Sequence, residues 1–173
     1  MGLVRKLSIV LGASLLPGAW AQAEEAPLDP RSAAMLATHN HERERLGVPA
    51  LRWNAALARD AYAWADRLAQ QGHMVHSSHA QRRNAGENLW MGPKGYYSPQ
   101  VMVGTFLDER QYFKPGNFPD ISTTGNWYDV GHYSQVIWRD TREVGCAIAE
   151  GPREEFLVCR YWPAGNFWGQ PVY

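Results

Sequence analysis

The feature that most constrains the fold of this chain is a pair of short apolar runs near the C-terminus, each containing one of its two cysteines. EVGCAIAE (143–150) and EFLVCRYW (155–162) are separated by GPRE, which predicts an antiparallel hairpin with a four-residue loop. If Glu150 lies opposite Glu155, then Cys146 faces Cys159, and such a pair can form a disulfide in suitable cross-strand geometry. Two free buried thiols are the alternative, since two cysteines alone supply too few ligands for a zinc site.

The N-terminus has the order of segments found in a secretory signal peptide. MGLVRK supplies positive charge, LSIVLGASLLPGAW is apolar, and AQA precedes Glu24, which predicts a signal peptide over residues 1–23 with cleavage after Ala23. An uncleaved anchor is the weaker alternative, because Pro17 and Gly18 interrupt an apolar run that is short for a membrane span. We therefore expect a secreted or periplasmic protein whose contact with membranes is at most peripheral. An oxidising compartment also favours the disulfide.

Length and charge limit the organisation of the chain and its partners. The 173 residues are enough for one domain, which we expect over residues 35–173, preceded by a tail and helix start over residues 24–34. The formal net charge is zero and no Lys/Arg run is present, so we expect no nucleic-acid partner. Eight tryptophans and eight tyrosines indicate an aromatic-lined surface or cleft.

Capping residues predict three helices in the first two thirds of the chain. The first begins at Asp29-Pro30 and ends at Gly47, the second runs from the cap Asn54 to Gly72, and the third begins at Ser98-Pro99. Residues 73–86 and 114–126 are expected as loops, and GHYSQVIW (131–138) as a helix or turn. Because the clearest strand pair follows the helices, the fold class predicted is α+β, with a layered α-β-α arrangement.

The third helix carries a carboxylate on an apolar face. Met102, Phe106, Glu109 and Phe113 follow one another at helical spacing. A carboxylate there is costly unless it has a partner, is protonated, or borders a cleft. A glutamate that extends from the rim into water is the simpler interpretation. The functional interpretation requires a partner, for which Glu87, His132 and the three histidines of the loop are candidates: His73, His76 and His79.

Five ordered motifs resemble those of the CAP superfamily, which comprises cysteine-rich secretory proteins, antigen 5 and pathogenesis-related proteins and is also known by its SCP domain. The motifs are HNHER (39–43), HS (76–77), GENLW (86–90), GHYSQVIWRDT (131–141) and FLVCRYWPAGNFWG (156–169). They span essentially the whole expected domain. The resemblance implies a three-layer α-β-α sandwich of the CAP/SCP type and a bacterial secreted member of this superfamily.

The resemblance also implies a cleft lined by two histidines and two glutamates. Carried over residue by residue, these four side chains, which we call the tetrad, are His76, Glu87, Glu109 and His132. Glu109 has the weakest motif support, since FLDE stands where the family has Trp-Tyr-x-Glu. The family implies that His76 and His132 bind a divalent metal, most simply zinc, and two protein ligands imply a weak and exchangeable site.

Three functions remain open for such a protein. The family favours a binding or interaction module for a lipid, another small apolar ligand or a protein partner. A metal-dependent hydrolase or peptidase with Glu87 and Glu109 as catalytic residues is the alternative, although HExxH and Gly-x-Ser-x-Gly motifs are absent from the sequence. The third is a structural secreted domain whose tetrad only stabilises the fold through hydrogen bonds.

Overall fold

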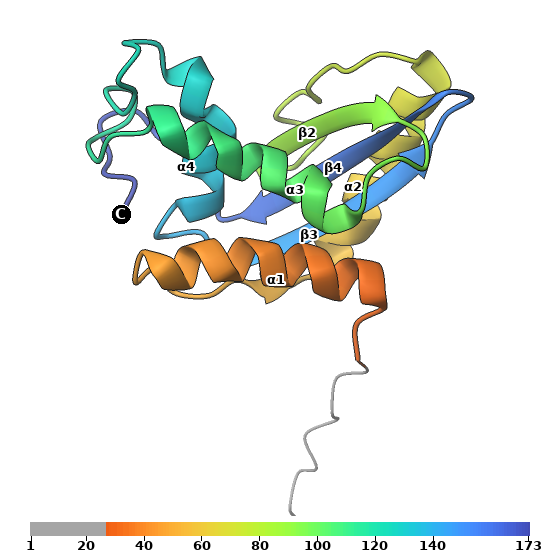
Figure 1. The fold of residues 1–173 in the computed structure, drawn as a ribbon, viewed down its shortest axis with the longest axis horizontal. Coiled ribbons are helices and arrows are strands. Elements are labelled where there is room, and N and C mark those ends of the chain that lie inside the picture. The colour runs from red at the N-terminus through yellow and green to blue at the C-terminus, as the bar shows by residue number, and fades with distance from the viewer. Residues whose placement is uncertain (1–26) are drawn as a thin grey trace, which may run out of the picture.

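The computed structural model describes residues 27–173, which form a sheet covered by helices on both faces (Figure 1). The predicted α+β fold class and the three layers are confirmed. The predicted signal peptide, residues 1–23, lies outside the described residues. No helix in the described part of the chain is both long and apolar enough to cross a membrane.

Four strands make up the middle layer in the order β1-β3-β4-β2. They are β1 (Arg52–Trp53), β2 (Gly86–Pro93), β3 (Glu143–Glu150) and β4 (Glu154–Trp162). β4 pairs antiparallel with both β2 and β3, and the short β1 runs parallel to β3.

The β3–β4 hairpin has the predicted register. Cys146 lies opposite Cys159 and Glu150 opposite Glu155, and the predicted disulfide is formed, with the two Cα atoms 4.1 Å apart. The disulfide therefore fixes two central strands of the sheet to each other.

One helix covers one face of the sheet. In α2 (Ala55–Gln71), the Asn54 side chain accepts hydrogen bonds from the first turn, and Gly72 ends the helix with a φ of 71°. The buried side of α2 packs against residues of β2, β3 and β4; the members of this cluster are Ala61, Ala65, Leu68, Ala69, Leu89, Ala149, Phe156 and Val158.

Three helices cover the other face: α1 (Pro30–Arg45), α3 (Pro99–Asp108) and α4 (Gly131–Ile137). Side chains alternate along β4, so that Phe156 and Val158 belong to the α2 cluster while Leu157, Cys159 and Tyr161 belong to the cluster under these three helices. The disulfide lies in this larger cluster.

Two elements differ from the sequence-based expectation. The third helix ends at Asp108 rather than continuing to Phe113, and a 3₁₀ turn (Glu109–Tyr112) follows it. Phe113 is extended and forms a bridge with Ser122. Gly86, expected as the end of the 73–86 loop, instead begins β2, and the GENLW motif forms the first part of this strand, which pairs with β4 over its whole length.

Candidate functional site

The first half of the site is a histidine–glutamate pair between the 73–85 loop and the start of β2. His76 Nδ1 lies 2.6 Å from Glu87 Oε1. Glu87 is the second residue of β2, and Ser77 donates to it from both its backbone N–H (3.0 Å) and its hydroxyl (2.8 Å). The side chain of Glu87 is 1% exposed, whereas that of His76 is 58% exposed. The glutamate is therefore a buried anchor for an accessible imidazole.

A buried arginine compensates the charge of Glu87. Arg160, in β4, donates to Glu87 and also to Asp60 Oδ2 at 3.0 Å and to Ser77 Oγ at 2.9 Å. Burial by itself would raise the pKa of Glu87, but the hydrogen bonds from His76 and Ser77 and the charge of Arg160 outweigh it and hold that pKa below its ordinary value. The carboxylate can then only accept hydrogen bonds, so Nδ1 of His76 carries the hydrogen.

The second half of the site is the pair formed by His132 and Glu109. His132 Nδ1 lies 2.5 Å from Glu109 Oε1, while Glu109 Oε2 accepts from the backbone N–H groups of His132 and Tyr133, both at 2.9 Å. These N–H groups belong to the first turn of α4, whose amides have no partner within the helix. Glu109 thus caps α4 and orients His132. The ring of Phe106 stacks on the imidazole of His132, with the two ring centroids 5.1 Å apart.

Both pairs leave the same imidazole nitrogen free. Nδ1 is engaged by a carboxylate in His76 and in His132, and Nε2 has no hydrogen-bond partner among the described residues in either ring. A carboxylate behind a histidine is the usual partner of a metal-binding imidazole, since it fixes the tautomer and the ring orientation. The tetrad residues therefore suit a metal held by two Nε2 atoms.

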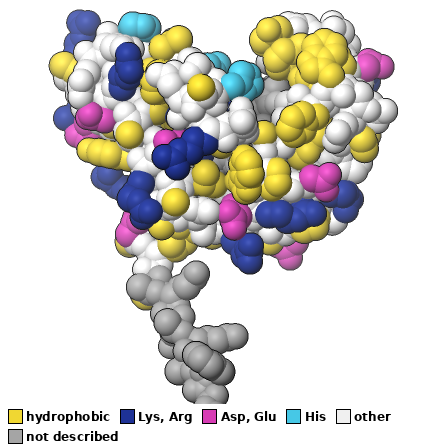
Figure 2. Space-filling model, turned by 180° about the vertical axis from the view of Figure 1, so that it is seen from behind, with side chains coloured by type: hydrophobic (Ala, Val, Ile, Leu, Met, Phe, Trp, Pro, Cys, Tyr) yellow, Lys and Arg dark blue, Asp and Glu magenta, His cyan; other side chains and the backbone are white. Residues whose placement is uncertain are grey.

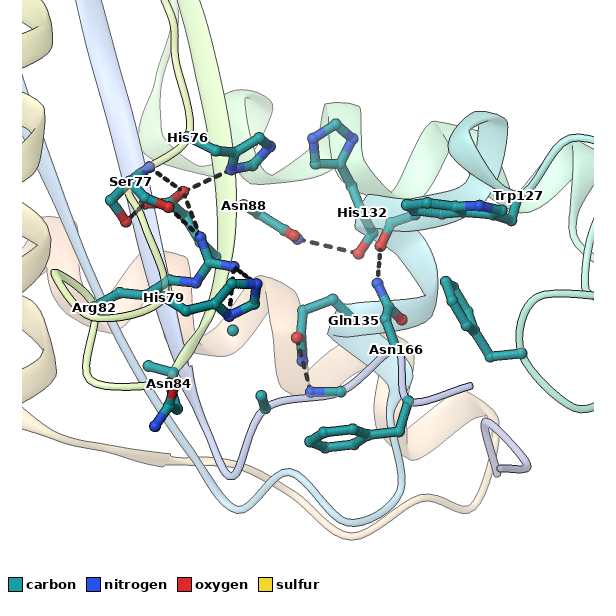
Figure 3. A pocket seen from close by; sticks show the side chains of 18 of the residues that line it. His76, Ser77, His79, Arg82, Asn84, Asn88, Trp127, His132, Gln135 and Asn166 are labelled. Carbon is teal, nitrogen blue, oxygen red and sulfur yellow. Dashed lines mark hydrogen bonds and ion pairs between the residues drawn. The ribbon is translucent and has the colours of Figure 1, made fainter. Parts of the chain in front are cut away.

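The two histidines line one cavity of about 840 Å³, which we call the cleft. Figure 3 shows the two rings at neighbouring positions along its wall. Glu87 also lines the cleft, but Glu109 is not among the lining residues and lies behind His132. The structure thus brings the four residues together as two separate histidine–carboxylate pairs.

The opposite wall of the cleft is aromatic. Figure 2 shows the molecule hollowed between two lobes, with imidazoles at the margin of the hollow and hydrophobic side chains gathered across from them. Trp168 is 72% exposed at this wall. The rings of Trp127 and Tyr128 stack with their centroids 3.8 Å apart. This aromatic wall consists of Phe118, Trp127, Tyr128, Phe167 and Trp168.

Amide side chains connect α4 to β2 and to the segment after β4. Asn88 donates to the backbone oxygen of His132 (3.1 Å), Asn166 donates to that of Gly131 (2.9 Å), and Gln135 accepts from the N–H of Gly165 (2.9 Å). All three amides line the cleft, and sequence reasoning did not select them. For Gln135 a signal existed, because a residue three positions after His132 lies on the same side of a helix.

The other loop histidines have different positions. His79 lines the cleft and contacts the guanidinium of Arg82, whereas His73 bonds only to the backbone oxygen of Gln71 and lies outside the cleft. Arg82 lines the cleft and Arg160 supports Glu87. Arg82 lies outside the five motifs, and Arg160 lies within FLVCRYWPAGNFWG but was assigned no role from the sequence. Their roles depend on pairing between loop, β2 and β4, which the local sequence does not reveal.

One other set of metal-ligating residue types lies close together in the described part of the chain. His39, Cys146 and Cys159 have their ligand atoms within 4.8 Å of one another. Both sulfur atoms are committed to the disulfide, and the His39 nitrogens already face Met35 O (2.7 Å) and the Tyr161 hydroxyl (2.8 Å). This set therefore lacks thiolates and free nitrogens for a metal.

Comparison with known sequences identifies similar proteins. A family model described as the cysteine-rich secretory protein family, CAP, matches residues 36–161. Pathogenesis-related protein 1A of Nicotiana tabacum is 35% identical over 139 residues, covering 80% of this chain and 78% of the tobacco protein. GLIPR1-like protein 1 of Bos taurus is 33% identical over 150 residues, and the match covers 76% of this chain but only 58% of the bovine protein.

Solved structures show the same fold at low sequence identity. A crystal structure of NaASP2 with Zn²⁺ has a TM-score of 0.71 at 21% identity, covering 87% of this chain and 88% of that one. BmVAL-1 has a TM-score of 0.69 at 23% identity, covering 86% and 84%.

Proposed function

Because the chain belongs to the cysteine-rich secretory protein (CAP) family, we propose that it is a secreted binding module whose cleft takes a small ligand with an apolar part beside a weak divalent-metal site. Members of this family are generally secreted and act through interaction or ligand binding, which supports the general class. The ligand, the metal and the export of this chain are proposals. The bacterial origin expected from the resemblance also stays an expectation.

The observation that carries the proposal is the contrast between the two walls of the cleft. One wall presents the free Nε2 atoms of His76 and His132, and the other presents exposed rings such as those of Trp168 and Tyr128. Binding pockets usually combine an apolar lining with a few polar groups that orient the ligand. A lipid or another small apolar ligand with one polar end fits this combination.

The metal part of the proposal rests on His76 and His132, with Glu87 and Glu109 orienting their rings. Zinc is the metal we propose, and a relative with the same fold was crystallised with Zn²⁺. A zinc ion there would act as a Lewis acid towards a ligand oxygen. Two protein ligands are fewer than the three or four typical of zinc sites, so we expect weak and exchangeable binding.

Export of the chain is proposed from the N-terminal pattern and the disulfide. Disulfides persist in oxidising compartments, and the Cys146–Cys159 bond is consistent with an extracellular protein. We expect cleavage after Ala23 and a secreted or periplasmic location. A protein partner is a further class of ligand that we propose. Mass spectrometry of the exported protein should give an N-terminus at Glu24.

Binding of a fluorescent fatty-acid probe separates the candidate functions. A binding module should bind the probe saturably and lose binding in Phe167→Ala/Trp168→Ala, while Tyr62→Ala/Tyr96→Ala, which removes two exposed tyrosines outside the cleft, should retain it. Loss of binding in both double variants, or no binding by the unchanged protein, would contradict an apolar ligand in the cleft.

The hydrolase and the structural domain predict different results. A metal-dependent hydrolase should lose turnover in Glu87→Gln or Glu109→Gln while the protein stays folded, because an open metal position activates water only in a correctly oriented site. A structural tetrad should show a lower melting temperature in these variants and no binding or turnover in any of them.

A further inference from the structure

A second cavity, of about 540 Å³, adjoins the cleft and has a different character. Arg82 and Ala85 line both cavities, so the segment that contains them separates the two. The second cavity extends from the first residues of α2 to Trp162 at the end of β4. We call it the arginine cavity.

Positive charge is concentrated in the arginine cavity. Arg59, Arg82 and Arg83 line it, and Asp60, the one carboxylate among its described lining residues, is already paired with Arg160. Within residues 27–173, Arg59 and Arg83 form no ion pair and no side-chain hydrogen bond. The whole chain has a formal net charge of zero, so the local excess is a property of this cavity.

Arg82 is the most constrained of the three arginines. Its side chain is 14% exposed, and it donates to the backbone oxygen of Ser77 and contacts the His79 ring. Its Nε is buried without a partner, the one such side-chain atom found in the described part of the chain. A buried donor without an acceptor is costly, and no acceptor for this Nε lies within the described residues.

The charges around the cavity do not balance. Among the described residues, Glu87 and Asp60 are the carboxylates that pair with Arg82 and Arg160, whereas Arg59 and Arg83 have no carboxylate partner. Two positive charges remain in excess. A dianion would balance them.

The backbone beside the cavity is held in an unusual conformation. Arg83 and Asn84 have φ values of 50° and 62°, in the left-handed region that non-glycine residues seldom adopt. The turn is closed by hydrogen bonds from Asn84 N to His79 O (2.9 Å) and from Arg83 N to Ala80 O (3.2 Å). Such strain persists only where the surroundings impose it, and it often accompanies a binding site.

We propose that the arginine cavity binds the phosphate group of a small phosphate monoester. Guanidinium groups match phosphate oxygens with paired hydrogen bonds, and a phosphate monoester carries close to two negative charges at neutral pH. The start of the 17-residue helix α2 at this cavity adds a favourable positive potential. Trp162, 46% exposed, offers a ring for the organic part of the ligand. This proposal does not depend on the function proposed for the cleft.

Calorimetric titration with inorganic phosphate and with phenyl phosphate tests this site. A chelator and constant low ionic strength exclude binding through a metal at His76 and His132. We expect saturable binding of both anions, tighter for phenyl phosphate, and a loss of roughly tenfold or more in affinity in Arg59→Gln/Arg83→Gln. The matched control, Arg31→Gln/Arg153→Gln, removes two exposed arginines outside the cavity and should bind phosphate unchanged.

Further titrations identify the source and class of the anion. Trp162→Ala should weaken phenyl phosphate but leave inorganic phosphate unchanged, with melting temperatures confirming that each variant is folded. Vesicles containing phosphatidic acid determine whether a lipid headgroup supplies the phosphate, and binding to them that Arg59→Gln/Arg83→Gln removes would also support the site. No saturable phosphate binding, equal loss in both arginine double variants, or acetate binding as tightly as phosphate would overturn the proposal.

Discussion

His39 is a buried histidine that the fold keeps neutral. It lies in α1 with no exposed surface, its Nδ1 beside Met35 O and its Nε2 beside the hydroxyl of Tyr161. Burial, with a contribution from the charge of Arg43, lowers the pKa of His39 to about 4 despite the hydrogen bond to Met35. Tyr161, the partner of His39, also accepts a hydrogen bond from the Asn88 side chain. Asn88 donates to the backbone oxygen of His132 as well, so hydrogen bonds connect His39 to the wall of the cleft.

This lowered pKa predicts a loss of stability in mild acid. The unfolded chain, with the ordinary histidine pKa of 6.5, binds the proton more readily than the folded chain, so stability is complete above that value and falls as the pH decreases towards about 4. Between about pH 7 and about pH 5 this amounts to about 2 kcal/mol in the free energy of unfolding. Urea unfolding at the two pH values measures it.

A neighbouring histidine provides the control. His39→Gln should remove most of this pH dependence, whereas His41→Gln, exposed on the same helix, should retain it. An unchanged pH dependence in His39→Gln would show that another group is responsible.

The two glutamates of the tetrad should differ in their effect on stability but not in their effect on zinc. Replacing either by glutamine removes the carboxylate behind an imidazole, which should weaken zinc binding by about 10- to 100-fold. Glu87→Gln should also lower the free energy of unfolding by about 3–5 kcal/mol, because Arg160 loses a buried partner. Glu109→Gln should lower the free energy of unfolding by less, because Glu109 is partly exposed and has no arginine partner within the described residues.

Zinc calorimetry together with urea unfolding tests this difference, with the exposed Glu44→Gln as control. Equal losses of stability in the Glu87 and Glu109 variants would contradict the role assigned to Arg160. Unchanged zinc affinity in both would contradict the orienting role of the carboxylates.

At the scale of elements, Gly145 determines how closely α2 packs on β3. A Cβ atom at Gly145 would lie 2.3 Å from the backbone nitrogen of Ala58 and 2.5 Å from the backbone oxygen of Asn54. Backbone atoms cannot move aside as a flexible side chain can, so Gly145→Ala should lower the free energy of unfolding by about 2 kcal/mol or more. A chemical unfolding curve measures this loss.

Gly104, in α3, is the matched control. A Cβ atom there would meet nothing within 4 Å, so Gly104→Ala should be neutral or stabilising by up to about 1 kcal/mol. If both alanine variants had the same stability, close packing of α2 on the sheet would not be the reason for a glycine at position 145.

The disulfide should stabilise the folded protein by an amount that depends on the length of the loop it closes, and this loop is short. Cys146 and Cys159 are 13 residues apart, for which loop entropy gives about 3 kcal/mol. Cys146→Ala/Cys159→Ala should therefore unfold at lower denaturant concentration but keep zinc binding, since neither cysteine lines the cleft. Loss of zinc binding in the folded double variant would indicate that the hairpin positions the histidines.

Elements whose signals are local were predicted more accurately than elements that depend on distant partners. The first two helices were predicted from the caps Asp29 and Asn54 and the stop at Gly72. The register of the β3–β4 hairpin was predicted from the equal spacing of its residues on either side of the loop. β2 begins with Gly86, Glu87 and Asn88, which have low strand propensity, and it is stabilised by pairing with β4. The predicted end of α3 was wrong, because the Glu109 side chain caps α4 and no local sequence pattern indicates this contact.

In the whole molecule, the cleft forms where residues from six separate segments meet: the 73–85 loop, β2, the 114–126 loop, the 3₁₀ turn Trp127–Val130, α4 and the C-terminal segment after β4. The resemblance to the CAP family predicted that His76, Glu87, Glu109 and His132 belong to one site. It did not predict that they form two pairs with Glu109 behind the wall, nor that Arg160 neutralises Glu87, because these contacts depend on how the layers pack.

We expect His76 and His132 to present their free nitrogens to one ligand or metal. Calorimetric titration of the purified protein with zinc tests it most directly, beside His76→Ala/His132→Ala and the control His41→Ala/His73→Ala, whose histidines are exposed outside the cleft. We expect weak, saturable, chelator-reversible binding that the first variant loses and the control retains. No binding by the unchanged protein, or equal binding by all three, would contradict it.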